Sequence, residues 1–266
     1  MTLLTIDAHL VYDLPAAADL LLQVEVAAIA GQAIRSGTLT LPKDVETHRI
    51  PAEAALGERI WMHVPEGRFD VRYEAEVDVT RPPPDLSGLP ATAYHDLTPE
   101  ATSFLMPSRY CPSDLFLSTV LDLFGGLRGG AQAQAIRDWI HDHFAYVPGA
   151  SDASTTALDS YMLRQGICRD YAHVFVAMAR AVGLPARVAS VYAPGVDPPD
   201  FHAVAEVWLA DAWHLVDPTG MAGPEEIAVI GIGRDAAEVS FMTIQGRATL
   251  VEQTVSCTRG DEARRE

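Results

Sequence analysis

Hydrophobic and polar residues alternate along the first eighty positions of the chain, as they do in half-buried antiparallel strands. Residues 69–80 alternate cleanly, and one face of that segment carries Phe69, Val71, Tyr73, Ala75, Val77 and Val79. Residues 20–26 alternate in the same way, and residues 60–64 form a further candidate strand that ends at Pro65. Because no strong helical pattern occurs before residue 85, we predict a small β-sandwich over residues 1–85.

The hydrophobic period becomes helical after residue 90. We expect helices at 115–124, 131–144 and 168–182, and strands at 186–192, 203–209 and 213–216. The last helix stops where Gly183 and Pro185 follow it, which is a common termination signal. Arg81-Pro82-Pro83-Pro84-Asp85 stiffens the chain and predicts a linker. The pattern therefore indicates a β-rich first part, followed by a second domain of helices and strands over residues 86–266.

The composition is that of a globular protein, and the net charge of the chain excludes some classes of binding partner. Hydrophobic residues make up 48% and charged residues 21% of the 266 residues. There are 19 Lys and Arg against 36 Asp and Glu, a formal net charge of −17. A surface this acidic repels phosphate backbones and anionic lipids, so we expect neither nucleic acid nor a membrane as a partner.

The cysteines and the N-terminal segment bear on the compartment. Cys111, Cys168 and Cys257 include no CxxC spacing, which disfavours a disulfide framework and a cysteine-rich zinc site. No apolar run approaches the roughly 18 residues needed to span a bilayer. The N-terminal segment has no Lys or Arg and carries Asp7 and Asp13, unlike a signal peptide. We therefore expect a cytoplasmic protein with reduced thiols, without a cofactor or a metal.

Candidate chemistry begins at Cys168, which opens the predicted helix over residues 168–182. A thiol at a helix N-terminus faces unpaired backbone N–H groups and the positive end of the helix dipole. Both favour the thiolate, which is the nucleophilic form. Gly166, just before, lets the backbone turn tightly into the helix. Taken alone, Cys168 is as readily a small buried hydrophobic residue.

His202 and Asp217 lie on a predicted β-hairpin whose register brings them together. With a two-residue loop at Ala210-Asp211, opposing residue numbers sum to 421, so Val204 faces Asp217. Opposed residues, and residues two apart on one strand, share a face of the sheet, which makes Asp217 the diagonal neighbour of His202. A loop with an odd number of residues would reverse this parity. A carboxylate that orients an imidazole beside a thiol is the Cys-His-Asp arrangement of acyl transfer.

Each of these residues also has an ordinary structural interpretation. His202 alone would be a strand histidine at the solvent edge, and Asp217 a turn residue. Their order after Cys168, within fifty residues, favours a joint role. Asp170 and His173 do not share the face of Cys168, so we expect them to hold the helix start through hydrogen bonds.

The remaining candidates are assigned to structure. Three aromatic residues are expected to fill the core rather than line a cleft: Trp139, Tyr146 and Tyr161. Cys111 is expected to be packed, because no base pattern lies near it. The backbone N–H of Cys168 is preferred over the side chain of Gln165 as the donor to an oxyanion.

Two stretches resemble a known family: GICRDYAHVFVAMARAVGLPARVASVYAPG at 166–195 and DFHAVAEVWLADAWHLVDPTG at 200–220. They look like the core of the transglutaminase-like cysteine-enzyme superfamily, in its bacterial branch. PSRYCPSD at 107–114 and GRDAAEVSF at 233–241 also resemble that branch, and the resemblance covers about residues 95–250. It implies a papain-like α+β fold, in which a helix that carries the nucleophile packs on an antiparallel sheet. It further implies Cys168 as nucleophile, His202 as general base and acid, and Asp217 as the orienting carboxylate.

The chain departs from the animal enzymes that crosslink glutamine to lysine. Those enzymes have Gln before and Trp after the nucleophile, where this chain has Ile167 and Arg169, and it lacks a D-x-D-x-D-G calcium loop. Family membership therefore fixes the chemistry better than the substrate. We expect acyl transfer on amide bonds of a peptide, a protein or a small amide, through a thioester. Hydrolysis is the first choice and transamidation the alternative.

Two hypotheses from other functional classes stay open. One is a binding protein of the same fold with a vestigial triad, against which the three intact residues speak. The other is a mononuclear zinc site of Cys168, His202 and Asp217 with water as the fourth ligand. A cysteine at a helix start beside a His-Asp pair fits acyl transfer better.

Overall fold

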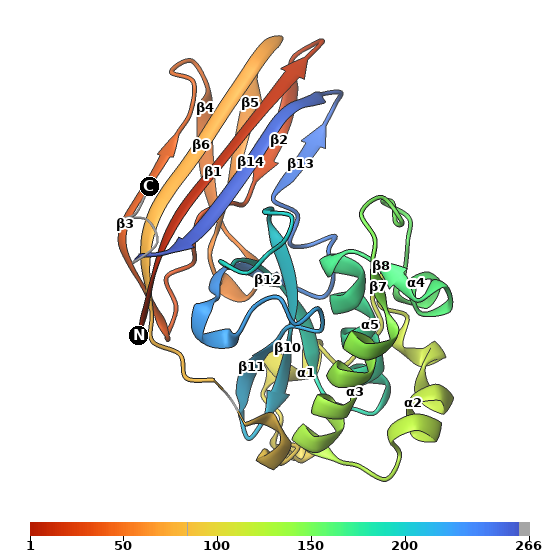
Figure 1. Ribbon diagram of the computed structural model, residues 1–266. Helices are drawn as coiled ribbons and strands as arrows, with labels where there is room; N and C mark the ends of the chain where they lie inside the picture. The colour runs from red at the N-terminus through yellow and green to blue at the C-terminus, as the bar shows by residue number, and fades with distance from the viewer. Residues whose placement is uncertain (84, 261–266) are drawn as a thin grey trace.

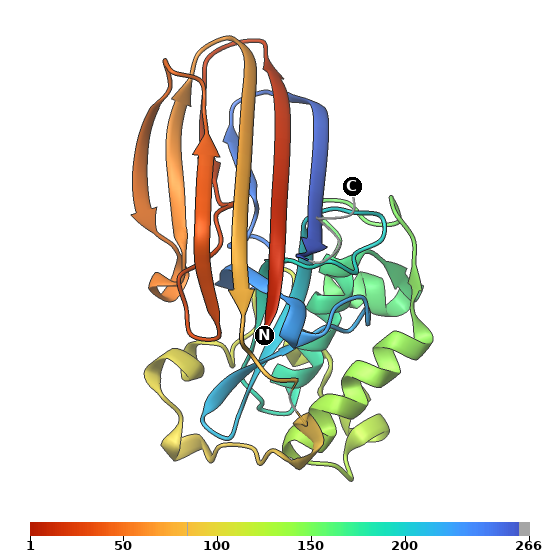
Figure 2. The same ribbon diagram turned by 60° about the vertical axis from the view of Figure 1, so that its left-hand side comes forward.

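The computed structural model describes residues 1–83 and 85–260, and it combines a β-sandwich with a helical layer on a third sheet (Figures 1 and 2). The first sandwich sheet has the order β14-β1-β6-β3: Thr249–Arg259, Thr2–Leu14, Gly67–Val79 and Gln32–Thr40. The second has the order β13-β2-β5-β4: Met242–Gln245, Ala18–Leu22, Glu58–Val64 and Glu46–Pro51. Neighbouring strands in both sheets are antiparallel.

The alternation seen in the sequence places one face of each inner strand in the sandwich core. Every second residue of β6 from Phe69 to Val79 is buried, as predicted. These side chains belong to one hydrophobic cluster with Leu20, Leu22 and Met62 of the facing sheet. The period of two therefore predicted both the strands and the buried face, and the β-sandwich is confirmed.

The C-terminal strands β13 and β14 return to the sandwich. β14 pairs with β1 and β13 pairs with β2, so blue C-terminal strands lie beside red N-terminal ones (Figure 1). The sequence boundary at residue 85 left Met242–Arg259 with the second part of the chain, whereas the structure pairs these strands with the first. β14 gave no clear signal because it is an edge strand, in which Val255 alone is buried.

The third sheet is antiparallel and carries the predicted hairpin. Its order is β11-β10-β9-β12: Ala212–Val216, His202–Leu209, Ala186–Tyr192 and Ala228–Gly233. The helices are α1 to α5: Pro99–Ser103, Leu117–Phe124, Gly129–His143, Ala157–Leu163 and Cys168–Ala181. A short parallel pair, β7 (Ala145–Tyr146) and β8 (Gln165–Gly166), precedes α5. The predicted helices at 115–124, 131–144 and 168–182 correspond to α2, α3 and α5.

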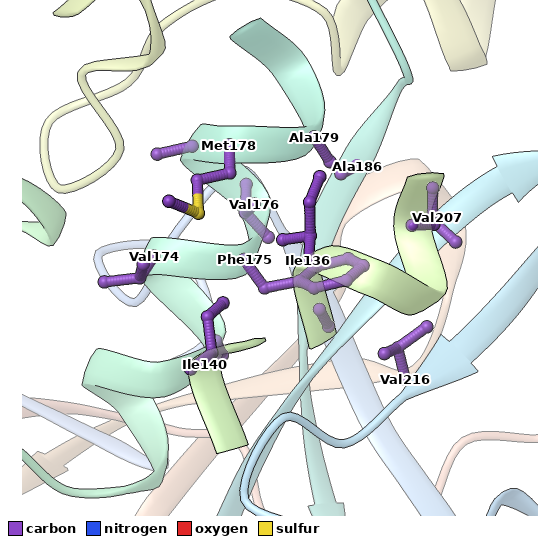
Figure 3. Packing of buried hydrophobic residues seen from close by; sticks show 14 of the residues in the cluster. Ile136, Ile140, Val174, Phe175, Val176, Met178, Ala179, Ala186, Val207 and Val216 are labelled. Carbon is purple, nitrogen blue, oxygen red and sulfur yellow. The ribbon is translucent and has the colours of Figure 1, made fainter. Parts of the chain in front are cut away.

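Helix α5 is the central element of this second core. It packs against both α3 and the third sheet, and Phe175 lies near Ile136 of α3 and Val207 and Val216 of the sheet (Figure 3). From Asp170 to Arg180 every residue of α5 is buried, including its polar ones. Its first residue therefore has a fixed position. Within the described part of the chain, no helix is both long and apolar enough to cross a bilayer.

Candidate active site

Cys168 is the first residue of α5, and the start of this helix is held by Asp170. The carboxylate of Asp170 accepts the backbone N–H of Ile167 at 2.8 Å and the hydroxyl of Ser151 at 2.5 Å. Gly166 packs against this cap, because a Cβ there would lie 2.6 Å from Cβ and Oδ2 of Asp170. Asp170 thus has its expected role, and close packing rather than a tight turn requires the glycine.

The predicted hairpin has the predicted register. Its loop is Ala210-Asp211, with positive φ values of 47° and 61° that suit a two-residue connection, and opposing residues sum to 421. His202 and Asp217 consequently lie on the same face of the sheet. Nε2 of His202 and Oδ2 of Asp217 are 3.0 Å apart. Because a carboxylate only accepts, Nε2 is the protonated nitrogen of the ring.

Asp217 is buried, and both of its carboxylate oxygens accept two hydrogen bonds. Oδ1 accepts the backbone N–H and the hydroxyl of Thr219 at 2.9 and 2.7 Å. Oδ2 accepts His202 and the backbone N–H of Ala222 at 3.0 and 2.9 Å. Burial alone would raise the pKa of Asp217, but the bonds from His202 and Thr219 lower it below its usual range. A negative charge is therefore fixed on the Nε2 side of the imidazole.

His202 is 1% exposed, so it is buried rather than at the solvent edge. Its Nδ1 makes no hydrogen bond of standard length to a described residue, which leaves this nitrogen available to the thiol of Cys168. Burial opposes a charge on the ring, but interactions with Asp217 and Cys168 raise the pKa of His202 to about 10. The environment therefore favours an imidazolium, which is the natural counterion of a thiolate.

Cys168 and His202 both line a pocket of about 390 Å³, which is within the usual range for a small-molecule site. Phe201 and Phe241 form an aromatic part of its lining, with stacked rings 4.5 Å apart. A wider hollow of about 690 Å³ lies on the sandwich near Trp61, but no cysteine lines it. The smaller pocket is the candidate active site because it contains the thiol.

Tyr146 is a site residue that the sequence analysis assigned to the core only. It packs against the core cluster, as predicted, but it also lines the pocket beside Cys168. Burial and the nearby Cys168 raise the pKa of its hydroxyl above the ordinary value. The parallel pairing of Tyr146 with Gly166 places it there, and a two-residue strand leaves no period that a sequence can show.

Three other predicted residues lie away from the pocket. Cys111 is fully buried, as expected, and burial raises its pKa to about 12. Cys257 lies on β14, and burial raises its pKa to about 12 as well. The expectation for His173 was wrong, since its Nε2 accepts the backbone N–H of Ala236 at 3.1 Å. It therefore ties the segment after β12 to α5, not the helix start.

Part of the chain matches a known protein family. Residues 126–218, which contain Cys168, His202 and Asp217, match the Transglutaminase-like superfamily. A solved Cytophaga hutchinsonii protein, named "putative cysteine protease", is similar in structure with a TM-score of 0.92 and 28% identity. The match covers 98% of this chain and 91% of that one, so it includes both the sandwich and the core.

The curated relatives are longer than the region they share with this chain. An uncharacterized Mycobacterium tuberculosis protein is 27% identical over 215 residues, 67% of this chain and 66% of that protein. A Pseudomonas aeruginosa protein-glutamine gamma-glutamyltransferase is 32% identical over 108 residues, 36% of this chain and 16% of that protein. The chain thus spans less than two thirds of either relative. The family match over residues 126–218 and the structural likeness over nearly the whole chain confirm the resemblance of this chain to the transglutaminase-like superfamily.

Proposed function

We propose that the protein is a cysteine-dependent acyltransferase on amide bonds that passes the acyl group to water, as a protease or amidase does. One observation carries the proposal. His202, hydrogen-bonded to the buried Asp217, shares a pocket with a thiol at the start of a buried helix. The names of two similar proteins, a "putative cysteine protease" and a protein-glutamine gamma-glutamyltransferase, support chemistry on amides.

The groups in the pocket suffice for both half-reactions. The Cys168 thiolate attacks the carbonyl carbon, and the backbone N–H of Cys168 stabilises the oxyanion. The His202 imidazolium gives its proton to the leaving amine as the C–N bond breaks, which leaves a thioester and a neutral imidazole. His202 then takes a proton from a water molecule that attacks the thioester. The acid leaves and the thiolate–imidazolium pair forms again, while Asp217 holds the ring through Nε2.

Transamidation is the second candidate. The thioester would be the same, and an amine would take the place of water as the acceptor. The name of the Pseudomonas aeruginosa relative favours this outcome, although the shared segment covers only 36% of this chain. Hydrolysis stays the first proposal because water, as the solvent, is far more abundant than any amine.

The geometry favours acyl transfer over a zinc site made of the same three residues. Asp217 uses Nε2 of His202, so an ion bound at Nδ1 would lie at the far edge of the ring from the carboxylate. Among residues 1–83 and 85–260, no group of three His, Cys, Asp or Glu side chains is arranged to hold a metal ion. A cytoplasmic location and the absence of nucleic-acid and membrane partners stay predictions from the sequence.

Mass spectrometry of the acyl-enzyme tests the proposal. The protein is incubated with a library of peptides and small amides, quenched in acid and mapped by peptide. We expect an acyl adduct on Cys168 that hydroxylamine removes and that Cys168→Ser lacks. Added amine then separates the two outcomes, since hydrolysis gives a free acid and transamidation a new amide. Product that forms equally in Cys168→Ser, or a library without any adduct or product, would refute the proposal.

A further inference from the structure

The pocket of Cys168 contains a carboxylate for which the reaction has no use. Asp200 lies two residues before His202, in the exposed segment that leads into β10, and lines the pocket. Its Oδ1 accepts the side-chain amide of Gln253 at 2.5 Å and the backbone N–H of Phe201 at 2.7 Å. Both donors are neutral, so neither cancels the charge of the carboxylate.

The other charged groups of the pocket have partners of opposite charge. Cys168 and His202 are a thiolate–imidazolium pair in the proposed mechanism. Arg169 lines the pocket, but its Nε lies 3.6 Å from Oδ1 of Asp170, and its Nη2 donates to the Ser151 hydroxyl at 3.1 Å. Asp200 is therefore the uncompensated charge among the described residues that line the pocket. Desolvation by the surrounding chain raises the pKa of Asp200, and a bound cation would relieve that penalty.

The lining next to Asp200 is apolar and rests on the sandwich. Phe201 and Phe241 stack on each other and pack against the hydrophobic cluster of the two sandwich sheets. Gln253, the donor to Asp200, belongs to β14 of the same sandwich. The β-sandwich thus holds both the aromatic lining and the carboxylate in place, although none of the three reacting residues lies in its strands.

We propose that Asp200 is a specificity-determining residue, positioned by Gln253, that selects substrates with a cationic group beside an apolar group near the scissile amide. A peptide with a Lys or Arg next to an aliphatic or aromatic side chain has this chemistry. The proposal rests on the proposed function, because it concerns the substrate of the same thiol. The net charge of −17 also attracts cationic substrates, over a longer range.

Thiol reagents that share one reactive group and differ in charge test Asp200 without a known substrate. Methanethiosulfonates that carry a trimethylammonium, a methyl or a sulfonate group are compared, and the rate at Cys168 is read by mass spectrometry. In Asp200→Asn we expect the ratio of cationic to neutral rates to fall about fivefold, the factor for one charge pair at close range in water. The neutral rate should stay within about twofold, because Asn keeps the oxygen that accepts from Gln253.

Glu66→Gln is the matched control, since it removes the same charge from an exposed turn of the sandwich between β5 and β6. It should leave the ratio unchanged. An unchanged ratio in Asp200→Asn, or an equal fall in Glu66→Gln, would overturn the proposal. The neutral rate reports on the nucleophile and the ratio on Asp200, so the two proposals fail separately. A second test compares two amide substrates that differ only in carrying Lys or the uncharged norleucine at one position. Asp200→Asn should raise KM for the Lys substrate and leave kcat unchanged.

Discussion

Asp217→Asn separates the charge of the orienting carboxylate from its shape. Oδ2 of Asp217 accepts from His202 at 3.0 Å and from the Ala222 N–H at 2.9 Å, while Oδ1 accepts twice from Thr219. Asparagine has one oxygen acceptor and one NH₂ group. If its oxygen takes the place of Oδ1, its NH₂ group faces two donors, and both hydrogen bonds of Oδ2 are lost.

The structure gives the size and the sign of the effect on stability. Two bonds to an ionised acceptor are worth about 1.5–3 kcal/mol each, and partial relaxation leaves an expected loss of about 3 kcal/mol in the free energy of unfolding. His202 has a folded pKa of about 10 against an ordinary 6.5, so its contribution is complete below pH 6.5 and is lost as pH rises toward 10. The difference between parent and variant is therefore largest near pH 6 and shrinks toward pH 10.

Two assays measure the effect of Asp217→Asn. Urea unfolding at pH 6 and pH 9 measures stability, and the rate of Cys168 alkylation by iodoacetamide measures the pair with His202. We expect alkylation at pH 6 to slow about tenfold, the factor for a loss of about 1.4 kcal/mol from the pair. Turnover on an amide should fall by up to roughly four orders of magnitude, though less than in Cys168→Ala.

Thr219→Val is the matched control, because it removes the 2.7 Å hydroxyl bond to Asp217 and leaves the carboxylate and His202 in place; it also removes the 3.2 Å bond that the hydroxyl accepts from the Met221 N–H. It should cost about 1 kcal/mol of stability and keep the parent's dependence of alkylation on pH. If Asp217→Asn also keeps that dependence, the carboxylate does not orient His202 and the reasoning is refuted.

Two further substitutions test the base and the helix start. His202→Ala should slow alkylation of Cys168 at pH 6–7, with a gap that narrows toward pH 10 where the parent also loses the imidazolium; an identical pH profile would exclude His202 as the partner. Gly166→Ala puts a Cβ 2.6 Å from Asp170 and should lower the free energy of unfolding in urea by about 2 kcal/mol. At Gly126 a Cβ meets nothing within 4 Å, so Gly126→Ala is the control, and an equal loss in both variants would contradict the tight packing.

The hairpin and α5 could be predicted because their signals are local. A two-residue loop sets the register of β10 and β11, and that register alone places Asp217 beside His202. The apolar stripe of α5 could be predicted from its helical period, and its stop from Gly183, which follows the C-cap Val182 with a positive φ. The sequence pattern could not show how deeply a side chain is buried. Taken alone, the strand pattern would place His202 at the solvent edge, whereas the residue is 1% exposed, next to Asp217 and in the pocket of Cys168.

The rest depended on contacts between distant parts of the chain. β3 and β4 are exposed along almost their whole length, so no buried face marks them in the sequence. β13 and β14 join the sandwich only through pairing with β2 and β1, more than 200 residues away. Tyr146 enters the pocket through a two-residue pairing, and Asp200 is held by Gln253 from another sheet. Contacts between residues so far apart in the chain leave no periodic pattern in the sequence.

Competition among the three thiols is the most direct test of Cys168 as the nucleophile. The protein is treated with a low dose of iodoacetamide at pH 6.5–7, and each cysteine is quantified by peptide mass spectrometry over time. Cys111 is fully buried and Cys257 is partly exposed, and burial raises the pKa of each to about 12. Cys168, beside the His202 imidazolium, should therefore be labelled well before both. Equal labelling of the three cysteines, or labelling of Cys257 first, would show that Cys168 is not an activated nucleophile.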